Sequence, residues 1–580
     1  PAVGTIIRSS GAGADISIDG PRGGSPTVTE YRQSDADSVW RFEIDPLNPE
    51  RVYKRSYYTY GTLLAKSTFM EYGDSVFDKT TEFTDCEGNK VMTENFDSDG
   101  RIYYVYDIYG RLCYTIPEVC AASMTENTSY GWDDSMISRY CYLNVYDERG
   151  NVIREYSPAS EPKILIYDRR DRLILARDGN HSAASQWAFS KYDVFDRPVM
   201  TGILYGGTED YHRQRAAACT ELFETRSGAP SSLHLYTNRC YPVIVPDSSE
   251  VYGVNYYDDY SWDDIAWGGA ESGVNLWVSG QLTRTKTKVL GEQKWLNKVV
   301  YYDEKYRKVK MLSELYPDGT QTDIRRYDFR GNMVEETVRQ SGTAGQEGFV
   351  RRYTYDDWGR LTGITQSTDG DTRNGLVELV TYTHDDLGEI STRRFHDSER
   401  GARTVYRRNL TGTDVRQSGP VNMRMKYGQA GNYFSGSQPY TRLTEFTWDS
   451  QHGNNGYAYD YDDRGRLTRG AYLQLDGSSS TQDEYDIVTA GSVELEYDTR
   501  TDNILGIARS GNNMPMSYEG YRMTTVRMPG GQTSEKFRYD AAGNLTYDGQ
   551  SRQHYRYNPL GRLASVFDTA QRTDTVNVFT

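Results

Sequence analysis

One seven-residue phrase recurs along this chain of 580 residues and constrains its fold more than any other feature. Its fullest form is Tyr-Asp-x-x-Gly-Arg-Leu, as in "YDDWGRL" from Tyr355. Clear copies begin at Tyr106, Tyr146, Tyr167, Tyr192, Tyr302, Tyr327, Tyr355, His384, Tyr461, Tyr539 and Tyr557, and weaker copies at Thr84, Phe96 and Tyr497. Adjacent copies often lie roughly 20–30 residues apart, a spacing typical of repeat proteins.

Each position of the phrase has a physical role in a β-hairpin. Aromatic residues alternate before it, as at Tyr353 and Tyr355, which places them on one face of a strand. Asp-x-x-Gly fits a four-residue turn whose carboxylate accepts a backbone N–H two residues on. Glycine permits a positive φ, so that the second strand leaves with the right twist. Each phrase therefore predicts one hairpin.

The acidic and glycine positions are interpreted as structural turn residues, and no catalytic, cofactor-binding or metal-ligating residue is assigned. The turn residues are Asp107, Gly110, Asp147, Gly150, Asp168, Asp171, Asp193, Asp196, Asp328, Gly331, Asp356, Gly359, Asp385, Gly388, Asp462, Gly465, Asp540, Gly543, Asn558 and Gly561. Asp171 and Asp196 replace the glycine, and Asp tolerates the left-handed conformation. Tyr306 also replaces it, and there we expect a turn of different shape.

Composition favours a folded, strand-rich protein with thin layers. Only 37% of the residues are hydrophobic, yet 13% are aromatic and 50 are tyrosines, which form strands well. The net charge of −16 argues against a broad nucleic-acid or anionic-membrane surface, both of which need clustered Lys and Arg. No stretch approaches the roughly 20 apolar residues of a membrane span, so membrane insertion is not expected.

The number of hairpins predicts that the sheet curls. A dozen or more hairpins give roughly 25 strands, which at about 4.8 Å each would form a ribbon about 120 Å long. Open twisted sheets rarely exceed about ten strands without curling. The low apolar share favours a hollow form over a packed centre. We therefore predict an all-β fold, a spiral antiparallel β-sheet of stacked β-hairpins.

Chemical motifs are few. "NFDSDG" (95–100) is similar to the start of a calcium loop, but its twelfth position is Tyr106, and a plain turn is favoured. Gly-Lys, Gly-x-Ser-x-Gly and His-Glu-x-x-His are absent from the sequence, so we expect neither an enzyme nor a cofactor. The aromatic run "YSWDDIAWGG" (260–269) could stack on sugar rings, although packing on the sheet is the commoner outcome.

The six cysteines leave two alternatives open. They are Cys86, Cys113, Cys120, Cys141, Cys219 and Cys240. Buried free thiols are favoured, while disulfides such as Cys113–Cys120 or Cys219–Cys240 would need an oxidising compartment.

The recurrence over residues 80–580 resembles YD-repeat, or RHS (rearrangement hot spot), proteins. "IYDRRDRLILARDGN" (166–180) with "AFSKYDVFDRPVMTGI" (188–203) is similar to the upstream part of long bacterial RHS proteins. "FRYDAAGNLTYDGQSRQHYRYNPLGRLASV" (537–566) is similar to the segment before their core domain. The resemblance implies a cocoon-like shell, secreted or on the bacterial cell surface, that encloses a C-terminal toxin.

The resemblance also sets the expected organisation and partners. We expect a lead-in, cap or divergent repeats at 1–80, YD repeats at 81–203, an insertion or divergent repeats with a short helix near 211–226 at 204–300, and YD repeats at 301–580 that stop before the core domain. The family's self-cleavage residues follow the repeats and are not expected here. The expected partner is the protein's own C-terminal core or toxin segment, or other chains that complete the shell. The alternative is a surface adhesin that uses the sheet as a scaffold and binds glycans or a partner protein through 204–300.

Overall fold

The computed structural model divides the chain into two compact units, which are described separately. Unit 1 comprises Pro1–Lys163, Thr404–Arg556 and Ser565–Asn577, and unit 2 comprises Ile164–Arg403, Tyr557–Ala564 and Val578–Thr580. The residues described are 6–9, 27–35, 37–72, 75–95, 100–229, 232–262, 265, 267, 274–342, 345–367, 375–386, 388, 390–395, 403–409, 412–418, 422–427, 442–450, 453–462, 464–474, 492–509, 512–528, 535–568 and 575–578.

Strands dominate both units. The elements up to residue 156 are β1 (Ile6–Ser9), β2 (Thr27–Gln33), β3 (Trp40–Asp45), β4 (Asn48–Tyr57), β5 (Leu64–Tyr72), β6 (Ser75–Thr84), β7 (Lys90–Asn95), β8 (Arg101–Tyr106), β9 (Leu112–Pro117), α1 (Glu118–Ala121), β10 (Ser129–Gly131), α2 (Ser135–Tyr140), β11 (Tyr142–Tyr146) and β12 (Val152–Tyr156). The next are β13 (Lys163–Tyr167), β14 (Leu173–Arg177), α3 (Gly179–Ala183), β15 (Gln186–Tyr192), β16 (Pro198–Tyr205), α4 (Glu209–Ala218), β17 (Ser249–Asp258), β18 (Val278–Lys288), β19 (Trp295–Tyr302), β20 (Lys308–Leu315), β21 (Gly319–Tyr327), β22 (Met333–Gly342), β23 (Gly345–Tyr355), β24 (Leu361–Ser367), β25 (Val377–His384) and β26 (Ile390–Phe395). The last are β27 (Arg403–Asn409), β28 (Gly412–Ser418), β29 (Asn422–Tyr427), β30 (Leu443–Ser450), β31 (Gly453–Tyr461), β32 (Leu467–Gln474), β33 (Ser492–Tyr497), β34 (Ile504–Arg509), β35 (Asn512–Glu519), β36 (Arg522–Val526), β37 (Glu535–Lys536), β38 (Arg538–Tyr539), β39 (Leu545–Asp548), β40 (Gln553–Tyr557), β41 (Leu563–Asp568) and β42 (Thr575–Val578).

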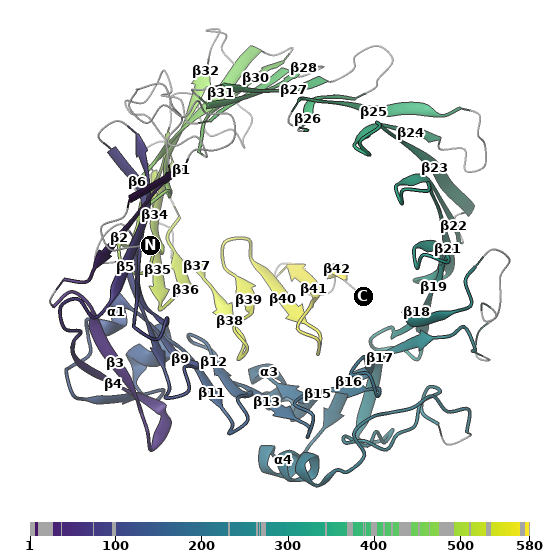
Figure 1. Ribbon diagram of the computed structural model, residues 1–580, viewed down its shortest axis with the longest axis horizontal. Coiled ribbons are helices and arrows are strands. Elements are labelled where there is room, and N and C mark those ends of the chain that lie inside the picture. Colours follow the sequence, from purple (N-terminus) through teal and green to yellow (C-terminus); the bar gives the residue numbers. More distant parts are fainter. Residues whose placement is uncertain are drawn as a thin grey trace. The chain divides into compact units, whose positions relative to one another are not determined.

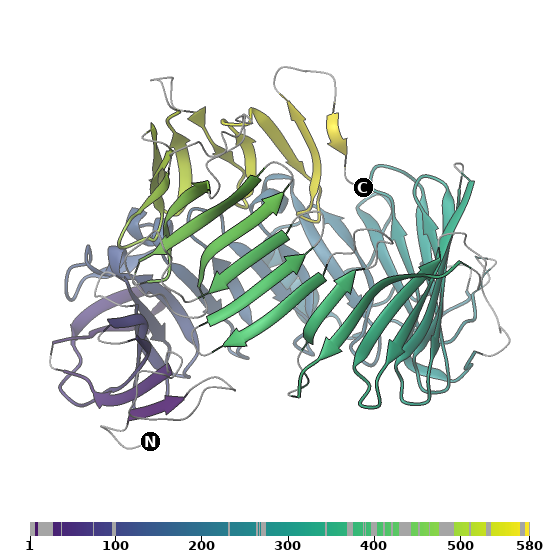
Figure 2. The same ribbon diagram turned by 90° about the horizontal axis from the view of Figure 1, so that it is seen from above.

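Unit 2 is built on a meander in which every strand from β13 to β26 pairs antiparallel with the next along the chain. Figure 1 follows these strands by label, and Figure 2 shows the same strands, coloured from blue through teal to green, lying alongside one another. The phrase ends one strand and starts its partner, as where Tyr355 pairs with Leu361 after a register shift. The predicted all-β class of stacked antiparallel hairpins is confirmed.

The meander separates two kinds of connection. Because strands alternate in direction, every second connection lies at the same end of the hairpins. The Tyr-Asp turns between β13 and β26 of unit 2 therefore form one rim, which we call the turn rim. The remaining connections, among them 178–185, 289–294 and 316–318, form the opposite rim, which we call the plain rim.

Unit 1 contains two runs of paired strands. The first runs β1–β2–β5–β6–β7–β8–β9–β11–β12, with β3, β4 and β10 in a small separate sheet. The second runs from β28 to β37 in chain order. The chain thus returns, after some 240 residues in unit 2, to the unit in which it began.

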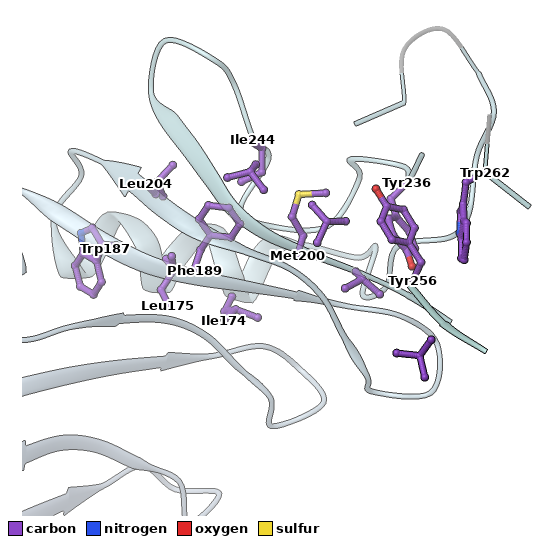
Figure 3. Close-up of a cluster of buried hydrophobic side chains, with 14 of the residues drawn as sticks. Ile174, Leu175, Trp187, Phe189, Met200, Leu204, Tyr236, Ile244, Tyr256 and Trp262 are labelled. Atoms are coloured by element: carbon purple, nitrogen blue, oxygen red, sulfur yellow. The ribbon is translucent and has the colours of Figure 1, made fainter. Parts of the chain in front are cut away.

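The apolar core of unit 2 lies where the connection between β16 and β17, which we call the covering segment, packs against the sheet. Leu175, Trp187 and Phe189 from the sheet meet Tyr236 and Ile244 from the covering segment, and Trp187 is fully buried (Figure 3). By contrast, the side chains of β20 and β22 are almost all half-buried or exposed. This part of the sheet therefore needs a source of stability other than a hydrophobic core.

The helix of this segment is shorter than expected. Instead of spanning 211–226, α4 begins at its cap Thr208, whose hydroxyl accepts the N–H of Tyr211 (3.2 Å), and ends at Ala218. The following residues, 219–225, form neither helix nor strand, and Glu224 among them pairs with Lys191 of β15 (2.7 Å).

Candidate functional site

The Tyr-Asp turn is the repeated unit of the site. In the copy from Tyr106, one carboxylate oxygen of Asp107 accepts the backbone N–H groups of Tyr109 (2.9 Å) and Arg111 (3.0 Å). The other oxygen accepts the Arg111 Nε–H (2.7 Å). Partial burial opposes ionisation of Asp107, but these N–H donors and the guanidinium charge hold its pKa below the ordinary value. Both oxygens of the carboxylate are therefore occupied by hydrogen bonds within the turn.

The other copies repeat this geometry. The residue at the glycine position donates its N–H to the carbonyl oxygen of the first turn residue at 2.9–3.2 Å, and its φ is positive. The residues with these features are Gly110, Gly150, Asp171, Asp196, Gly331, Gly359, Gly388, Gly465, Gly543 and Gly561, which follow Asp107, Asp147, Asp168, Asp193, Asp328, Asp356, Asp385, Asp462, Asp540 and Asn558. Aspartate at the glycine position forms the same turn as glycine.

The expectation of a different turn shape at Tyr306 is wrong. Tyr306 adopts a φ of 58° and donates its N–H to the carbonyl oxygen of Asp303 at 2.9 Å. Asp303 accepts the N–H groups of Lys305 and Arg307, both at 2.9 Å, as Asp107 accepts those of Tyr109 and Arg111. The carboxylate contacts and the two flanking strands stabilise the left-handed conformation. Their contribution outweighs the conformational cost of this backbone geometry for a tyrosine.

A ladder of tyrosine hydroxyls joins many of the copies to the one before them. Tyr192, for example, donates its hydroxyl to the carbonyl oxygen of Leu173, the last residue of the preceding phrase, at 2.7 Å. The same bond, at 2.7–3.1 Å, joins Tyr106 to Lys90, Tyr146 to Leu112, Tyr257 to Pro198, Tyr302 to Leu282, Tyr327 to Lys308, Tyr355 to Met333, Tyr461 to Leu443, Tyr497 to Leu467 and Tyr539 to Met523. The recurrent tyrosine is therefore a cross-link between hairpins.

The arginine of the phrase makes a second link. Arg307 binds its own Asp303, lies over the ring of Tyr327 in the next copy (4.8 Å), and donates to the carbonyl oxygen of Asp328 (3.0 Å). Arg111 and Arg172 make the corresponding contacts with the copies that follow them. One side chain thus fixes its own turn and the position of the next.

The ladder reveals copies that the sequence reading missed. Tyr257 pairs with Leu282, and the N–H of Gly280 donates to the side chain of Asp258 (2.6 Å), so residues 259–279 interrupt a single Tyr-Asp turn. Tyr427 pairs with Leu443 in the same way. A shortened copy begins at Tyr518, which pairs with Met523 after a register shift.

Removing one tyrosine hydroxyl tests the ladder. We expect Tyr192→Phe to destabilise its hairpin by about 1 kcal/mol, because the Leu173 carbonyl loses its donor. Hydrogen exchange should increase in 168–173 and 192–197. Tyr109→Phe, whose ring is exposed on a turn, is the control and should leave exchange unchanged. Equal exchange in the two variants would show that the ladder does not hold the hairpins.

Three late turns rest on the plain ends of early hairpins. In unit 1, Glu519 pairs with Arg139 (3.0 Å), the ring of Tyr521 meets that of Tyr140 edge-on (5.7 Å), and the Ala541 carbonyl accepts the N–H of Glu161 (3.1 Å). In unit 2, the Pro559 carbonyl lies 2.8 Å from Nε2 of His181 in α3.

The contact at His181 depends on pH. Its Nδ1 lies 2.7 Å from Asp178, so both ring nitrogens face acceptors, which only the imidazolium can satisfy. The hydrogen bond to Asp178 raises the pKa of His181 above its ordinary 6.5. Because the pKa of His181 is higher in the folded protein, the protonated ring stabilises the contact fully below pH 6.5. This stabilisation is lost as the pH rises through the pKa of the folded protein. We expect intrinsic-rate-corrected hydrogen exchange at 557–563 to be slower at pH 6 than at pH 8.5. His181→Gln should abolish this difference, and a difference that survives the substitution would contradict the assignment.

The cluster that most resembles catalytic chemistry is a structural tether. Lys191 and Glu224, both fully buried, pair at 2.7 Å, and Glu224 also accepts from the Cys240 thiol (2.7 Å) and the Thr237 hydroxyl (2.5 Å). Burial raises the pKa of Cys240 well above its usual range, which suppresses the nucleophilic thiolate. The cluster fixes the covering segment to β15.

The remaining candidates have structural roles or lie outside the described residues. Tyr260 and Trp262 are buried in the core, as the packing interpretation predicts, so they offer no surface to a sugar. The middle of the calcium-like sequence, 96–99, lies outside the described residues. Within the described part, no group of three or more His, Cys, Asp or Glu side chains could hold a metal ion.

All six cysteines are free thiols. Cys113, Cys120, Cys141 and Cys240 are buried, as favoured from the sequence, while Cys219 is half-buried and Cys86 is exposed. Among the helices of the described ranges, none has the length and apolar character needed to cross a bilayer.

Comparison with known proteins yields no sequence relative: no family model matches the chain, and no curated protein does. The solved structures that are similar include a Photorhabdus luminescens Tc holotoxin pore with a TccC3 mutation (13% identity, TM-score 0.35, 93% of this chain and 29% of that one) and a TcdB2–TccC3–Cdc42 crystal structure (12%, 0.32, 95% and 27%). A porin-like protein from Bacteroides uniformis is also similar (12%, 0.13, 39% and 83%). The chain spans less than a third of the length of the Tc chains. Scores of this size carry no weight for fold or function, and the fold described above depends on the strand pairings of this chain.

Proposed function

We propose that this chain is a non-enzymatic wall segment of an RHS-type bacterial toxin, secreted or displayed on the cell surface, that encloses a C-terminal toxin segment and shields it from proteases. The observation that carries the proposal is the ladder. A barrier to proteases must not open locally, and isolated hairpins are marginal in water. Here ten hairpins are tied to the preceding one by a tyrosine–carbonyl bond, and several also by an arginine that bridges two turns.

The site chemistry supports a passive role. The carboxylates of the repeated phrase are occupied by backbone N–H groups and guanidinium groups within their own turns. A catalytic carboxylate instead needs access to substrate and a pKa matched to proton transfer. The repeated acidic residues therefore serve the wall itself.

Protease protection tests the function. The gene should be expressed with the polypeptide encoded immediately after Thr580, and that polypeptide should also be expressed alone. We expect it to survive trypsin in the joined protein at doses that digest it alone. Tyr302→Phe/Tyr327→Phe should reduce this protection, because both lose ladder bonds.

The matched control is Tyr60→Phe/Tyr109→Phe, which changes two exposed rings. It should retain full protection. Equal digestion of the downstream polypeptide with and without the repeats would contradict the proposed function, and so would a reading frame that encodes nothing after Thr580.

A further inference from the structure

The turn rim of unit 2 carries a row of exposed aromatic side chains. Five successive turns contribute one each: Phe195, Trp277, Tyr306, Phe329 and Trp358. Trp277, Phe329 and Trp358 are 80–83% exposed, which is unusual for such large aromatic side chains. Exposed apolar residues that need no explanation are scattered singly over a surface. These five are regularly spaced in a row, which indicates an interaction surface.

Regular spacing follows from the fold. Successive Tyr-Asp turns are separated by two strands, which gives about 10 Å per step and roughly 40 Å for the row. Arginines lie against three of the rings, Arg197 on Phe195 (5.0 Å), Arg330 on Phe329 (5.4 Å) and Arg360 on Trp358 (4.8 Å). Each ring is thus held outward with an exposed face available to a partner.

The molecule itself shows what a Tyr-Asp turn rests on. The turn at 519–521 lies on Arg139 and Tyr140, the turn at Ala541 on Glu161, and the turn at Pro559 on His181. These three seats belong to three successive plain connections, 118–141, 157–162 and 178–185. Successive turns therefore seat on successive plain connections, one for each hairpin. Tyr521 shows that the exposed ring of a turn is used in this contact.

The two rims of unit 2 match each other in the same way. Both repeat once per hairpin, so their spacings are equal by construction. The plain rim offers polar side chains and a ring comparable with the Arg139–Tyr140 seat: Lys294 pairs with Asp318 (2.6 Å), and Tyr316 donates to Glu292 (2.9 Å). An open groove of about 660 Å³ runs beside them, lined by Trp295, Glu314, Asp318 and Ser341 among others.

We propose that the turn rim of unit 2, at Phe195, Trp277, Tyr306, Phe329 and Trp358, docks on the plain rim of unit 2 in a second copy of this chain. The contact repeats between molecules the seating that occurs three times within one. It is heterologous, since different surfaces of the two copies meet, so it leaves one free rim at each end. Association therefore extends beyond the dimer.

Sedimentation velocity over a hundredfold concentration range tests the proposal. We expect the wild-type chain to shift progressively to dimers and larger species. Trp277→Ser/Trp358→Ser should remain monomeric at concentrations where the wild type is mostly associated. The matched control, Leu47→Ser/Tyr60→Ser, removes two exposed apolar side chains away from the turn rim and should associate like the wild type. A wild type that stays monomeric throughout would overturn the proposal.

Cross-linking distinguishes the partner surface. A chain with Lys305→Cys on the turn rim should be joined by a bismaleimide to a chain with Asp318→Cys on the plain rim, in a background with Cys86 and Cys219 replaced by serine. Cross-links only between two Lys305→Cys chains would indicate a face-to-face dimer and contradict the proposal. Binding to anionic or neutral phospholipid vesicles that is lost in Trp277→Ser/Trp358→Ser, without self-association, would assign the row to lipid and also overturn it.

Discussion

Gly520→Ala is expected to release the turn at 518–523 from α2. Gly520 has a φ of 64°, and a Cβ placed there would lie 2.5 Å from the carbonyl oxygen of Arg139. Alanine in the left-handed conformation costs about 1–2 kcal/mol, and the overlap with backbone adds about 1–3 kcal/mol. Because backbone atoms cannot move aside as a flexible side chain can, the seat should open. Hydrogen exchange should increase in both 135–141 and 518–523.

The matched control is Gly561→Ala. Gly561 has a similar φ of 71° in another Tyr-Asp turn, but nothing lies within 4 Å of the added Cβ. Gly561→Ala should show only the cost of placing alanine in the left-handed conformation. Hydrogen exchange in 135–141 should stay unchanged. If the two variants lose equal stability, the turn at 518–523 does not rest on α2.

Lys191→Met is expected to free the covering segment of unit 2 from the sheet. The substitution removes the ammonium group that faces Glu224 in a site closed to solvent, and an uncompensated buried charge costs about 3–5 kcal/mol. Exchange and trypsin cleavage should increase in 219–241. The double variant Lys191→Met/Glu224→Gln should lose less stability than the sum of the losses in the two single variants. Stability losses that simply add would contradict the pairing of the two side chains.

The same pair predicts the effect of acid. Burial opposes ionisation of Glu224, but Lys191 and the surrounding donors lower its pKa below the ordinary 4.5. A lowered folded pKa stabilises the segment above pH 4.5, and this contribution is lost as pH falls through the folded value. Protection of 219–241 should therefore hold above pH 4.5 and decline as the pH falls below it, and Glu224→Gln should remove this dependence.

The hairpins could be predicted from the sequence because their determinants are local. Asp107 binds the N–H groups of residues two and four positions later, so composition and spacing within five residues specify the turn. The turn at Tyr306 differs from the prediction because the carboxylate of Asp303 and the paired strands hold the backbone there, which the propensity of tyrosine alone does not indicate.

The links between hairpins could not be predicted in this way. The hydroxyl of Tyr302 bonds to Leu282, and the distance along the chain between such partners varies from copy to copy because the connections vary. The interrupted copy at Tyr257 was overlooked for the same reason, although "YD" at 257–258 and "GQL" at 280–282 are its two halves. The Lys191–Glu224 pair joins a strand to an irregular segment, for which the sequence has no periodic signal.

The central structural claim is that the hairpins from β13 to β26 follow one another in chain order, one per phrase, with all their Tyr-Asp turns on one rim. Electron–electron distances between spin labels test this directly. Labels would be attached at Val194→Cys, Lys305→Cys and Asp357→Cys on the turn rim, with Cys86 and Cys219 replaced by serine. The interrupted copy counts as one step, so the 194–305 and 305–357 pairs are each two hairpins apart and the 194–357 pair is four.

The expected distances are about 20 Å for each of the two shorter pairs and about 40 Å for the longest, at about 10 Å per hairpin. Two results would contradict a continuous ladder of Tyr-Asp hairpins. One is a 194–305 distance much longer than about 20 Å, in keeping with the 111-residue separation of the labels in the sequence. The other is a set of distances that places the turn labels on opposite rims.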